Sequence, residues 1–158
     1  DRLRQVAVAH GVIGAGGLSL DRDGWLDLLL SHLIQPRLGG ERLCFVTSYP
    51  ASQAALARVQ PGGLWADRFE AFWQGIELAN GYHELADGKE LAVRIESDNC
   101  RRRAAGRRPL KADHHLLAAM DSGLPDSVGV AVGLDRLLML RLGRESIDDV
   151  LAFSLPRC

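Results

Sequence analysis

The chain has 158 residues, a formal net charge of -1, 47% apolar residues and 25% charged residues. These values are typical of a globular protein, so they argue against a disordered chain, and the near-zero charge gives no global attraction to nucleic acid or membranes. The length fits one domain rather than two, with a core that buries about 68–70% of the unfolded surface. We therefore expect a single domain over residues 1–158.

Three cysteines, Cys44, Cys100 and Cys158, are scattered and form no C-x-x-C pair. Because such a set is unsuited to a disulfide scaffold, it favours a reducing compartment. No apolar run approaches the ~18 residues of a membrane-spanning helix, and no basic-then-apolar leader opens the chain, so we expect a cytoplasmic protein without a membrane anchor. The sequence begins at Asp1 without a methionine, and we expect it to be part of a longer polypeptide.

Residues 1–40 predict a helical segment. A weak helical pattern covers residues 3–12 and ends before a glycine-rich stretch. Ser19 and Asp21 are candidate caps for a second helix, which runs to Pro36 and is apolar on most sides. We expect that second helix to be buried.

The next segment predicts the start of a sheet. Residues 42–49 are rich in β-forming side chains, which predicts a buried strand, and residues 51–59 predict a short helix. Two further strands follow around a tight bend, because residues 68–74 alternate in polarity, Gly75 supplies the bend and residues 76–85 continue. This pattern predicts a β-hairpin.

Three carboxylates, Glu70, Glu77 and Glu84, interrupt these apolar strands. An unpaired carboxylate among apolar side chains is costly, so each needs a cation or a hydrogen-bond donor. Alternation places Asn80 and Tyr82 on the face of Glu84. Glu77 belongs to the opposite face and meets the same ligand only if the strand is broken, which we expect at Asn80 and the glycine after it. An edge hairpin with one solvated face explains these residues equally well.

Residues 87–105 predict a long helix that ends near Gly106. Its end carries a cluster of arginines: Arg101, Arg102, Arg103, Arg107 and Arg108. The cluster indicates a contact with a polyanion or an acidic protein, although cations favoured by a helix C-terminus are an equally good explanation. Asp113 caps a shorter helix with His114 and His115, whose side chains point in different directions, so we expect no zinc site.

The last unit is a strand followed by a helix. Residues 127–132 predict a strand of small apolar residues, Gly133 allows a turn, and residues 134–142 carry a helical stripe. Arg136 falls in the first helical turn, where a cation opposes the helix dipole and calls for an anion to hold; a purely structural reason for this common arrangement stays open. Together the elements predict an α+β fold, an antiparallel β-sheet flanked by helices, with a site on the open face of the sheet.

Two segments resemble class II aminoacyl-tRNA synthetases of the lysine-activating branch, namely DRFEAFWQGIELANGYHEL at 67–85 and GLPDSVGVAVGLDRLLML at 123–140. The second is similar to the family's third signature motif. Three more segments resemble the synthetase paralogues that attach lysine or (R)-β-lysine to elongation factor P: YPASQAALA at 49–57, SDNCRRRAAGRRP at 97–109 and DDVLAFSLPR at 148–157. The resemblance covers residues 41–158, and residues 1–40 only loosely. It implies the C-terminal part of a class II catalytic domain.

The resemblance implies ATP and Mg2+ as cofactors. Glu70 and Glu77 correspond to carboxylates that hold ATP-bound magnesium, an ion that takes a few carboxylates plus phosphate oxygens. Leu78 and Gly133 would line the nucleotide. Arg136 would lie against it, since a guanidinium stacks on adenine or holds a phosphate. In this scheme Glu77 and Arg136 are the catalytic residues.

The same resemblance implies a lysine pocket made of Asn80, Tyr82 and Glu84, in which Glu84 accepts the side-chain ammonium. A buried charge-assisted bond of this kind is worth a few kcal/mol. Where the tRNA-charging enzymes have glycine-x-glycine-x-glycine ahead of the arginine, this chain has Ala131 in the middle position. We expect the added methyl group to change which lysine isomer fits.

The leading interpretation is ATP-dependent activation of lysine or β-lysine as an aminoacyl-adenylate, followed by transfer to a lysine of elongation factor P. The alternatives are a lysyl-tRNA synthetase domain that charges tRNA(Lys) and a non-catalytic, synthetase-like binding module. Retention of the three glutamates and Arg136 favours an enzyme. The first two class II motifs, which supply the dimer contact and much of the ATP binding, are not found. We therefore expect this chain to be inactive alone and to belong to a homodimer when full length.

Overall fold

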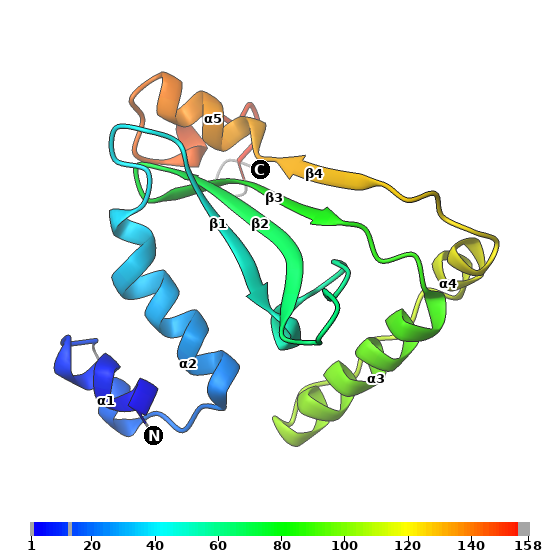
Figure 1. Cartoon of the computed structure of the whole chain (residues 1–158). Helices are drawn as coiled ribbons and strands as arrows, with labels where there is room; N and C mark the ends of the chain where they lie inside the picture. Colours follow the sequence, from blue (N-terminus) through cyan, green and yellow to red (C-terminus); the bar gives the residue numbers. More distant parts are fainter. Residues whose placement is uncertain (1, 13, 155–158) are drawn as a thin grey trace.

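The computed structural model describes residues 2–12 and 14–154 (Figure 1). Within these residues the chain forms a four-stranded antiparallel sheet in the order β1-β2-β3-β4. The strands are β1 Cys44–Pro50, β2 Trp65–Trp73, β3 Ile76–His83 and β4 Val128–Val132. The α-helices are α1 Arg2–Ala9, α2 Arg22–Leu29, α3 Gly88–Ala104, α4 His114–Asp121 and α5 Leu134–Arg141. The predicted α+β class with an antiparallel sheet is confirmed.

The helices flank the sheet in separate groups (Figure 1). α1 packs on α2, α3 packs on α4 at the other side of the molecule, and α5 follows β4 and contacts β3. Shorter helical turns complete the chain: η1 Ala15–Gly17, η2 Leu30–Ile34, η3 Gln35–Arg37, η4 Ala51–Gln53 and η5 Ile147–Asp149. The sheet thus forms the centre to which every group of helices is attached.

Aspartates begin three of the helices. The side chain of Asp21 accepts a hydrogen bond from a backbone amide of α2, and Asp87 and Asp113 do the same for α3 and α4. A cap of this kind stabilises a helix by about 1 kcal/mol, because it satisfies a backbone donor that the helix leaves free. The helices predicted after these three residues are confirmed.

The β2–β3 hairpin turns through two residues with positive φ, Gln74 at 49° and Gly75 at 76°. This geometry suits a two-residue hairpin loop, whose twist matches that of the strands. The backbone of Gly39 packs closely against this loop. A Cβ at residue 39 would lie 2.3 Å from the carbonyl oxygen of Phe72, and the φ of Gly39 is +66°. The end of the helical segment therefore packs directly on the turn, and the predicted bend at Gly75 is confirmed.

A β-bulge in β3 decides which side chains share a face. Ala71 pairs with Ala79 and the next residue, Phe72, pairs with Glu77, so Leu78 is the extra residue. The predicted break exists, but it lies at Leu78 and not at Asn80. The prediction at Asn80 rested on the tolerance of glycine for unusual backbone angles, whereas the bulge forms where Leu78 accepts a hydrogen bond from the start of α5.

Three further expectations from the sequence are wrong. α2 and η2 are only partly buried: Trp25 is buried, while Ile34 is 48% exposed. β1 is an edge strand rather than a buried one, with Phe45 55% exposed. Residues 51–59 form only the single turn η4, because Ala55 has a φ of 51° that a helix does not accept. Composition alone does not reveal how much of the neighbouring structure covers an apolar segment.

The core is divided into small clusters. One joins α1 to α2, one lies under β2 beside η4, and one joins Leu85 to α3 and α4. In the part of the chain that the structure describes, no helix has the length and apolar character needed to cross a membrane.

Candidate functional site

The bulge at Leu78 gives the sheet two chemically different faces. The face we call the polar face carries Arg68, Glu70, Glu77, Asn80, Tyr82 and, just past β3, Glu84. Without the bulge, alternation would place Glu77 on the other side. The register thus brings all three carboxylates and the predicted lysine-pocket residues to one face, with Gly129 and Ala131 of β4 beside them.

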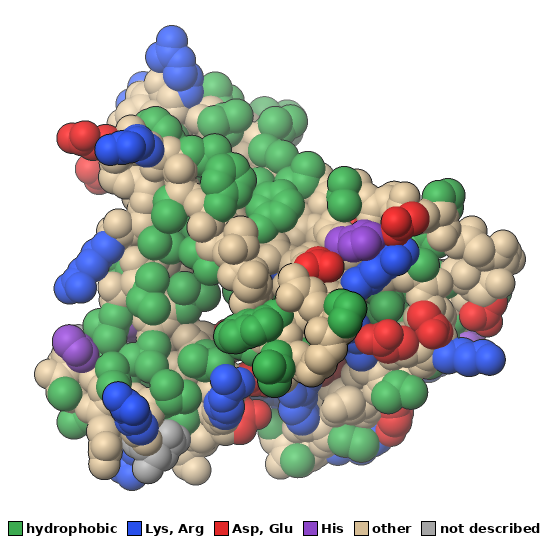
Figure 2. All heavy atoms as spheres, viewed as in Figure 1, with side chains coloured by type: hydrophobic (Ala, Val, Ile, Leu, Met, Phe, Trp, Pro, Cys, Tyr) green, Lys and Arg blue, Asp and Glu red, His purple; other side chains and the backbone are tan. Residues whose placement is uncertain are grey.

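The opposite face, which we call the apolar face, carries Phe45, Phe69, Val128, Val130 and Val132. Val128 is 80% exposed and Val130 is 55% exposed, so the described residues leave much of this face open. Figure 2 shows hydrophobic side chains gathered over the sheet and α5. Exposed apolar groups on this scale are typical of surfaces that contact other structure.

Glu70 finds its cation two residues away on the same strand. Its carboxylate accepts a hydrogen bond from the Arg68 guanidinium at 2.5 Å, and the side chains are only 10% and 16% exposed. The guanidinium stacks 4.4 Å above the ring of Tyr49 and also bonds the Gln53 carbonyl. An i,i+2 spacing in a strand places both partners on one face, so the sequence contains a signal for the Arg68 pairing, which was not among our predictions.

Two buried polar atoms of the polar face lack hydrogen-bond partners among the described residues: Arg68 Nε and Asn80 Oδ1. Burial raises the pKa of Tyr49, and the carboxylate of Glu70 beside it acts in the same direction. An unsatisfied buried polar group costs about 1–3 kcal/mol, so such groups in one place indicate a surface prepared for a polar ligand. No sequence signal pointed to Tyr49.

Two cavities open on this side of the sheet. One of about 520 Å3 lies between the sheet and α2 and includes Glu70, Arg68, Tyr49 and Asp27. Partial burial raises the pKa of Asp27, with the nearby Asp23 carboxylate as the second cause. The other, of about 360 Å3, lies beside α5 and includes Glu77 and Arg136. Glu70 and Glu77 therefore share a face but line different cavities.

The anion near Arg136 is Glu77. Its guanidinium donates to the carbonyl oxygen of Glu77 at 2.9 Å and lies 3.7 Å from the Glu77 carboxylate. The amide of Gly133 donates to the carbonyl of Leu78 at 2.8 Å, which ties the start of α5 to the bulge. The chain turns at Gly133 as expected, with a φ of -76° that other residues also adopt.

Glu84 lies against β4. A Cβ built on Gly129 would be 2.3 Å from Glu84 Oε1, so a larger residue there would force this carboxylate to shift. Within the residues described, no hydrogen bond or ion pair holds the Glu84 side chain, although its backbone is bonded on both sides. A carboxylate on a fixed backbone, without a cation of its own, is suited to bind a ligand cation.

The polar face offers donors and acceptors for ATP and magnesium. In the described range no three His, Cys, Asp or Glu side chains lie together as a ready metal site. The Glu77 carboxylate beside Arg136 nevertheless fits Mg2+, which usually keeps water and takes only one or two protein carboxylates besides phosphate oxygens; Glu70, paired with Arg68, would be the second. The half-exposed Arg136 guanidinium fits a phosphate or an adenine ring.

The arginine cluster lies around the end of α3. Arg101 pairs with Asp98 and Arg103 pairs with Glu96, both on the same helix. Arg107 and Arg108 form no ion pair among the described residues. The cluster thus divides into cations that serve the helix and cations left for a partner.

The fold and this face agree with one family of proteins. The chain matches the family described as tRNA synthetases class II (D, K and N) over residues 33–157, and it belongs to that family. It is 48% identical to the elongation factor P–(R)-β-lysine ligase of Vibrio atlanticus (strain LGP32) over 158 residues, which is 99% of this chain and 49% of the relative. The ligase of the same name from Klebsiella pneumoniae (strain 342) is 45% identical over 157 residues, 99% of this chain and 48% of the relative. The chain spans about half the length of the curated relatives it matches.

Proposed function

We propose that this chain is the C-terminal part of an ATP-dependent ligase that activates lysine or β-lysine and transfers it to a lysine of elongation factor P. The observation that carries the proposal is the unpaired Glu84 carboxylate over Gly129, on the same face as the Glu77–Arg136 contact. An amine acceptor and a phosphate-binding group on one open face are what amino-acid activation requires.

On the lysine side, Glu84 accepts the side-chain ammonium, and Asn80 and Tyr82 line the pocket beside it. The unsatisfied Asn80 Oδ1 supports this role, since it offers an acceptor that the protein does not use. Ala131, which pairs with Asn80 across the sheet, narrows the pocket from β4. We expect this methyl group to influence the choice between lysine isomers.

On the nucleotide side, Arg136 holds the phosphates or the adenine, with Leu78 and Gly133 lining the same region. Glu70 and Glu77 offer carboxylates for ATP-bound Mg2+, which would neutralise phosphate charge. Arg136 is positioned by its bond to the Glu77 carbonyl, so the guanidinium is oriented before a ligand arrives. The protein contributes geometry and electrostatics while the amino-acid carboxylate attacks the α-phosphorus, forming the aminoacyl-adenylate and releasing pyrophosphate.

The acceptor is assigned from the relatives, whose names specify elongation factor P. Their length supports a further part of the polypeptide that completes the site. We place residues 1–158 in one domain, expect the full-length protein to be a cytoplasmic homodimer, and expect the chain to be inactive alone.

The test is lysine-dependent ATP–pyrophosphate exchange by the full-length polypeptide, followed by transfer of labelled lysine or β-lysine. Exchange with transfer to elongation factor P is the expected result. Exchange with transfer only to tRNA(Lys) would instead identify a tRNA synthetase. Absence of lysine-dependent exchange would identify a non-catalytic module.

A further inference from the structure

We propose that Arg58 is a positioning residue for Glu84, and that with Asp126 it holds the backbone around Glu84 so that the carboxylate stays over Gly129. The inference rests on the proposed role of Glu84 in binding the lysine ammonium. Arg58 and Asp126 lie in loops beside Glu84 and are not part of the polar face.

The first part of this arrangement is the backbone of Glu84. Its amide donates to the carbonyl of Ser127 at 3.0 Å, and its carbonyl accepts from Arg58 Nε at 2.8 Å. Ala57 forms a β-bridge with Glu84 from the same segment as Arg58. The residue is therefore held on both sides, although it lies just beyond the regular part of β3.

The second part is the carboxylate of Asp126. Asp126 Oδ1 lies 2.9 Å from the Arg58 guanidinium and 2.6 Å from Nε2 of His83. One carboxylate thus joins the residue before Glu84, the arginine that bonds Glu84, and the loop that leads into β4. His83 and, second, Arg58 lower the pKa of Asp126, which keeps that carboxylate ionised.

The third part is the small clearance at the ligand end. In its present position the Glu84 carboxylate leaves no space for a methyl group on Gly129. A relative shift of β3 and β4 by a fraction of an ångström would change where the carboxylate points, and displacements of about 1 Å cost catalytic sites up to ~100-fold. Holding the two strands in register is therefore a requirement of the pocket.

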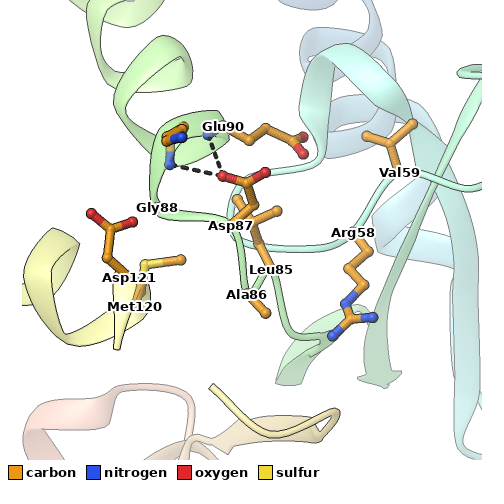
Figure 3. Close-up of a pocket in the computed structure, with 10 residues that line it drawn as sticks. Arg58, Val59, Leu85, Ala86, Asp87, Gly88, Glu90, Met120 and Asp121 are labelled. Atoms are coloured by element: carbon orange, nitrogen blue, oxygen red, sulfur yellow. Dashed lines mark hydrogen bonds between the residues drawn. The ribbon is translucent and has the colours of Figure 1, made fainter. Parts of the chain in front are cut away.

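Arg58 has no competing role in the neighbouring cavity. It lines a space of about 580 Å3 at the start of α3 together with Asp87 and Glu90. No ion pair joins Arg58 to either carboxylate in the described part of the chain, and Figure 3 shows its guanidinium directed away from both. Its polar atoms serve Glu84 and Asp126 instead.

Arginine is needed here because two acceptors lie in different directions. The planar guanidinium presents Nε to the Glu84 carbonyl and a terminal nitrogen to Asp126. Lysine has a single charged nitrogen and cannot reproduce this fork. The substitution Arg58→Lys therefore keeps the charge and removes one of the two bonds.

The experiment measures pyrophosphate exchange by the full-length polypeptide with Arg58→Lys. We expect the KM for lysine to rise about tenfold, as for loss of one hydrogen bond, while kcat and the KM for ATP stay within about twofold. Preference for lysine over norleucine, which lacks the ammonium, should fall by the same factor. Arg4→Lys is the matched control, because Arg4 also donates to a backbone carbonyl, that of Gly16, but in the α1–η1 region and not beside Glu84.

Hydrogen exchange at the Glu84 amide provides a second readout. It should be faster in Arg58→Lys than in the parent, because the Ser127 bond depends on the same register. An unchanged lysine KM, or equal losses for lysine and norleucine, in an active parent overturns the positioning role alone. A parent without lysine-dependent exchange overturns the proposed function, and the positioning role falls with it.

Discussion

The two faces of the sheet invert the usual relation between polarity and burial. On the polar face, Glu70 is 8% exposed and its partner Arg68 is shielded between aromatic rings. On the apolar face, Val128 is 80% exposed. A chain that folded only to bury apolar surface would do the reverse.

This difference between the two faces indicates which surfaces serve binding rather than stability. Burying an ion pair such as Arg68–Glu70 is at best a small gain in stability, because desolvation offsets the attraction between the charges. Its presence beside unsatisfied polar atoms therefore indicates ligand binding rather than folding. The apolar face has little cover among the described residues, and its charged side chains, Asp67 and His83, contact each other at one end of it. It has the character of a contact surface.

Of all changes to the two faces, neutralising Glu84 on the polar face should have the largest effect on lysine binding. In Glu84→Gln the ammonium of lysine loses a charge-assisted bond worth about 1.5–3 kcal/mol, so the KM for lysine in pyrophosphate exchange should rise about 10- to 100-fold. Val130→Thr, a substitution of similar shape on the apolar face, is the control and should leave this KM unchanged. An unaltered lysine KM in Glu84→Gln would remove Glu84 from the pocket.

A smaller effect is expected from crowding the same carboxylate. Gly129→Ala places a methyl group 2.3 Å from Glu84 Oε1, so the carboxylate must move and the lysine KM should rise about tenfold. Gly16→Ala is the control, since nothing lies within 4 Å of its added Cβ. Normal lysine binding by Gly129→Ala would show that the pocket does not depend on this contact.

The arginine cluster lies on neither face of the sheet, and changing it should distinguish lysine activation from lysine transfer. Arg107→Glu with Arg108→Glu reverses two cations without ion pairs, and should weaken transfer to elongation factor P several-fold while pyrophosphate exchange stays unchanged. Arg2→Glu with Arg42→Glu reverses the same charge elsewhere and should affect neither step. Equal loss of exchange and transfer would count against docking by this cluster.

The smallest effect concerns Tyr49. Because its pKa is raised in the folded state, the unfolded chain ionises first, so this residue lowers the free energy of unfolding as pH rises above about 10. Tyr49→Phe should remove that part of the alkaline loss. Urea unfolding of both proteins at pH 8 and above 10 measures the difference, and identical pH slopes would contradict the assignment.

The sequence predicted the elements that depend on local signals. Asp87 and Asp113 mark the starts of their helices, and Gly75 marks the hairpin turn, because caps and turns are decided by neighbouring residues. The Asn80–Glu84 face was also predictable from alternation. These predictions required no knowledge of distant contacts.

The sequence did not predict features that depend on pairing between strands. The bulge at Leu78 is determined by register against β2 and by the bond to Gly133, and neither is visible in a window of sequence. The burial of Tyr49 and the reach of Arg58 to Glu84 likewise depend on loops far apart in the chain. The apolar character of β1 gave no indication that it lies at an edge.

The most direct test of the account is a crystal structure of the full-length polypeptide with a non-hydrolysable lysyl-adenylate analogue. The account predicts the lysine ammonium within about 3 Å of the Glu84 carboxylate and the nucleotide against Arg136. An analogue bound elsewhere, or bound with its ammonium turned away from Glu84, would contradict it.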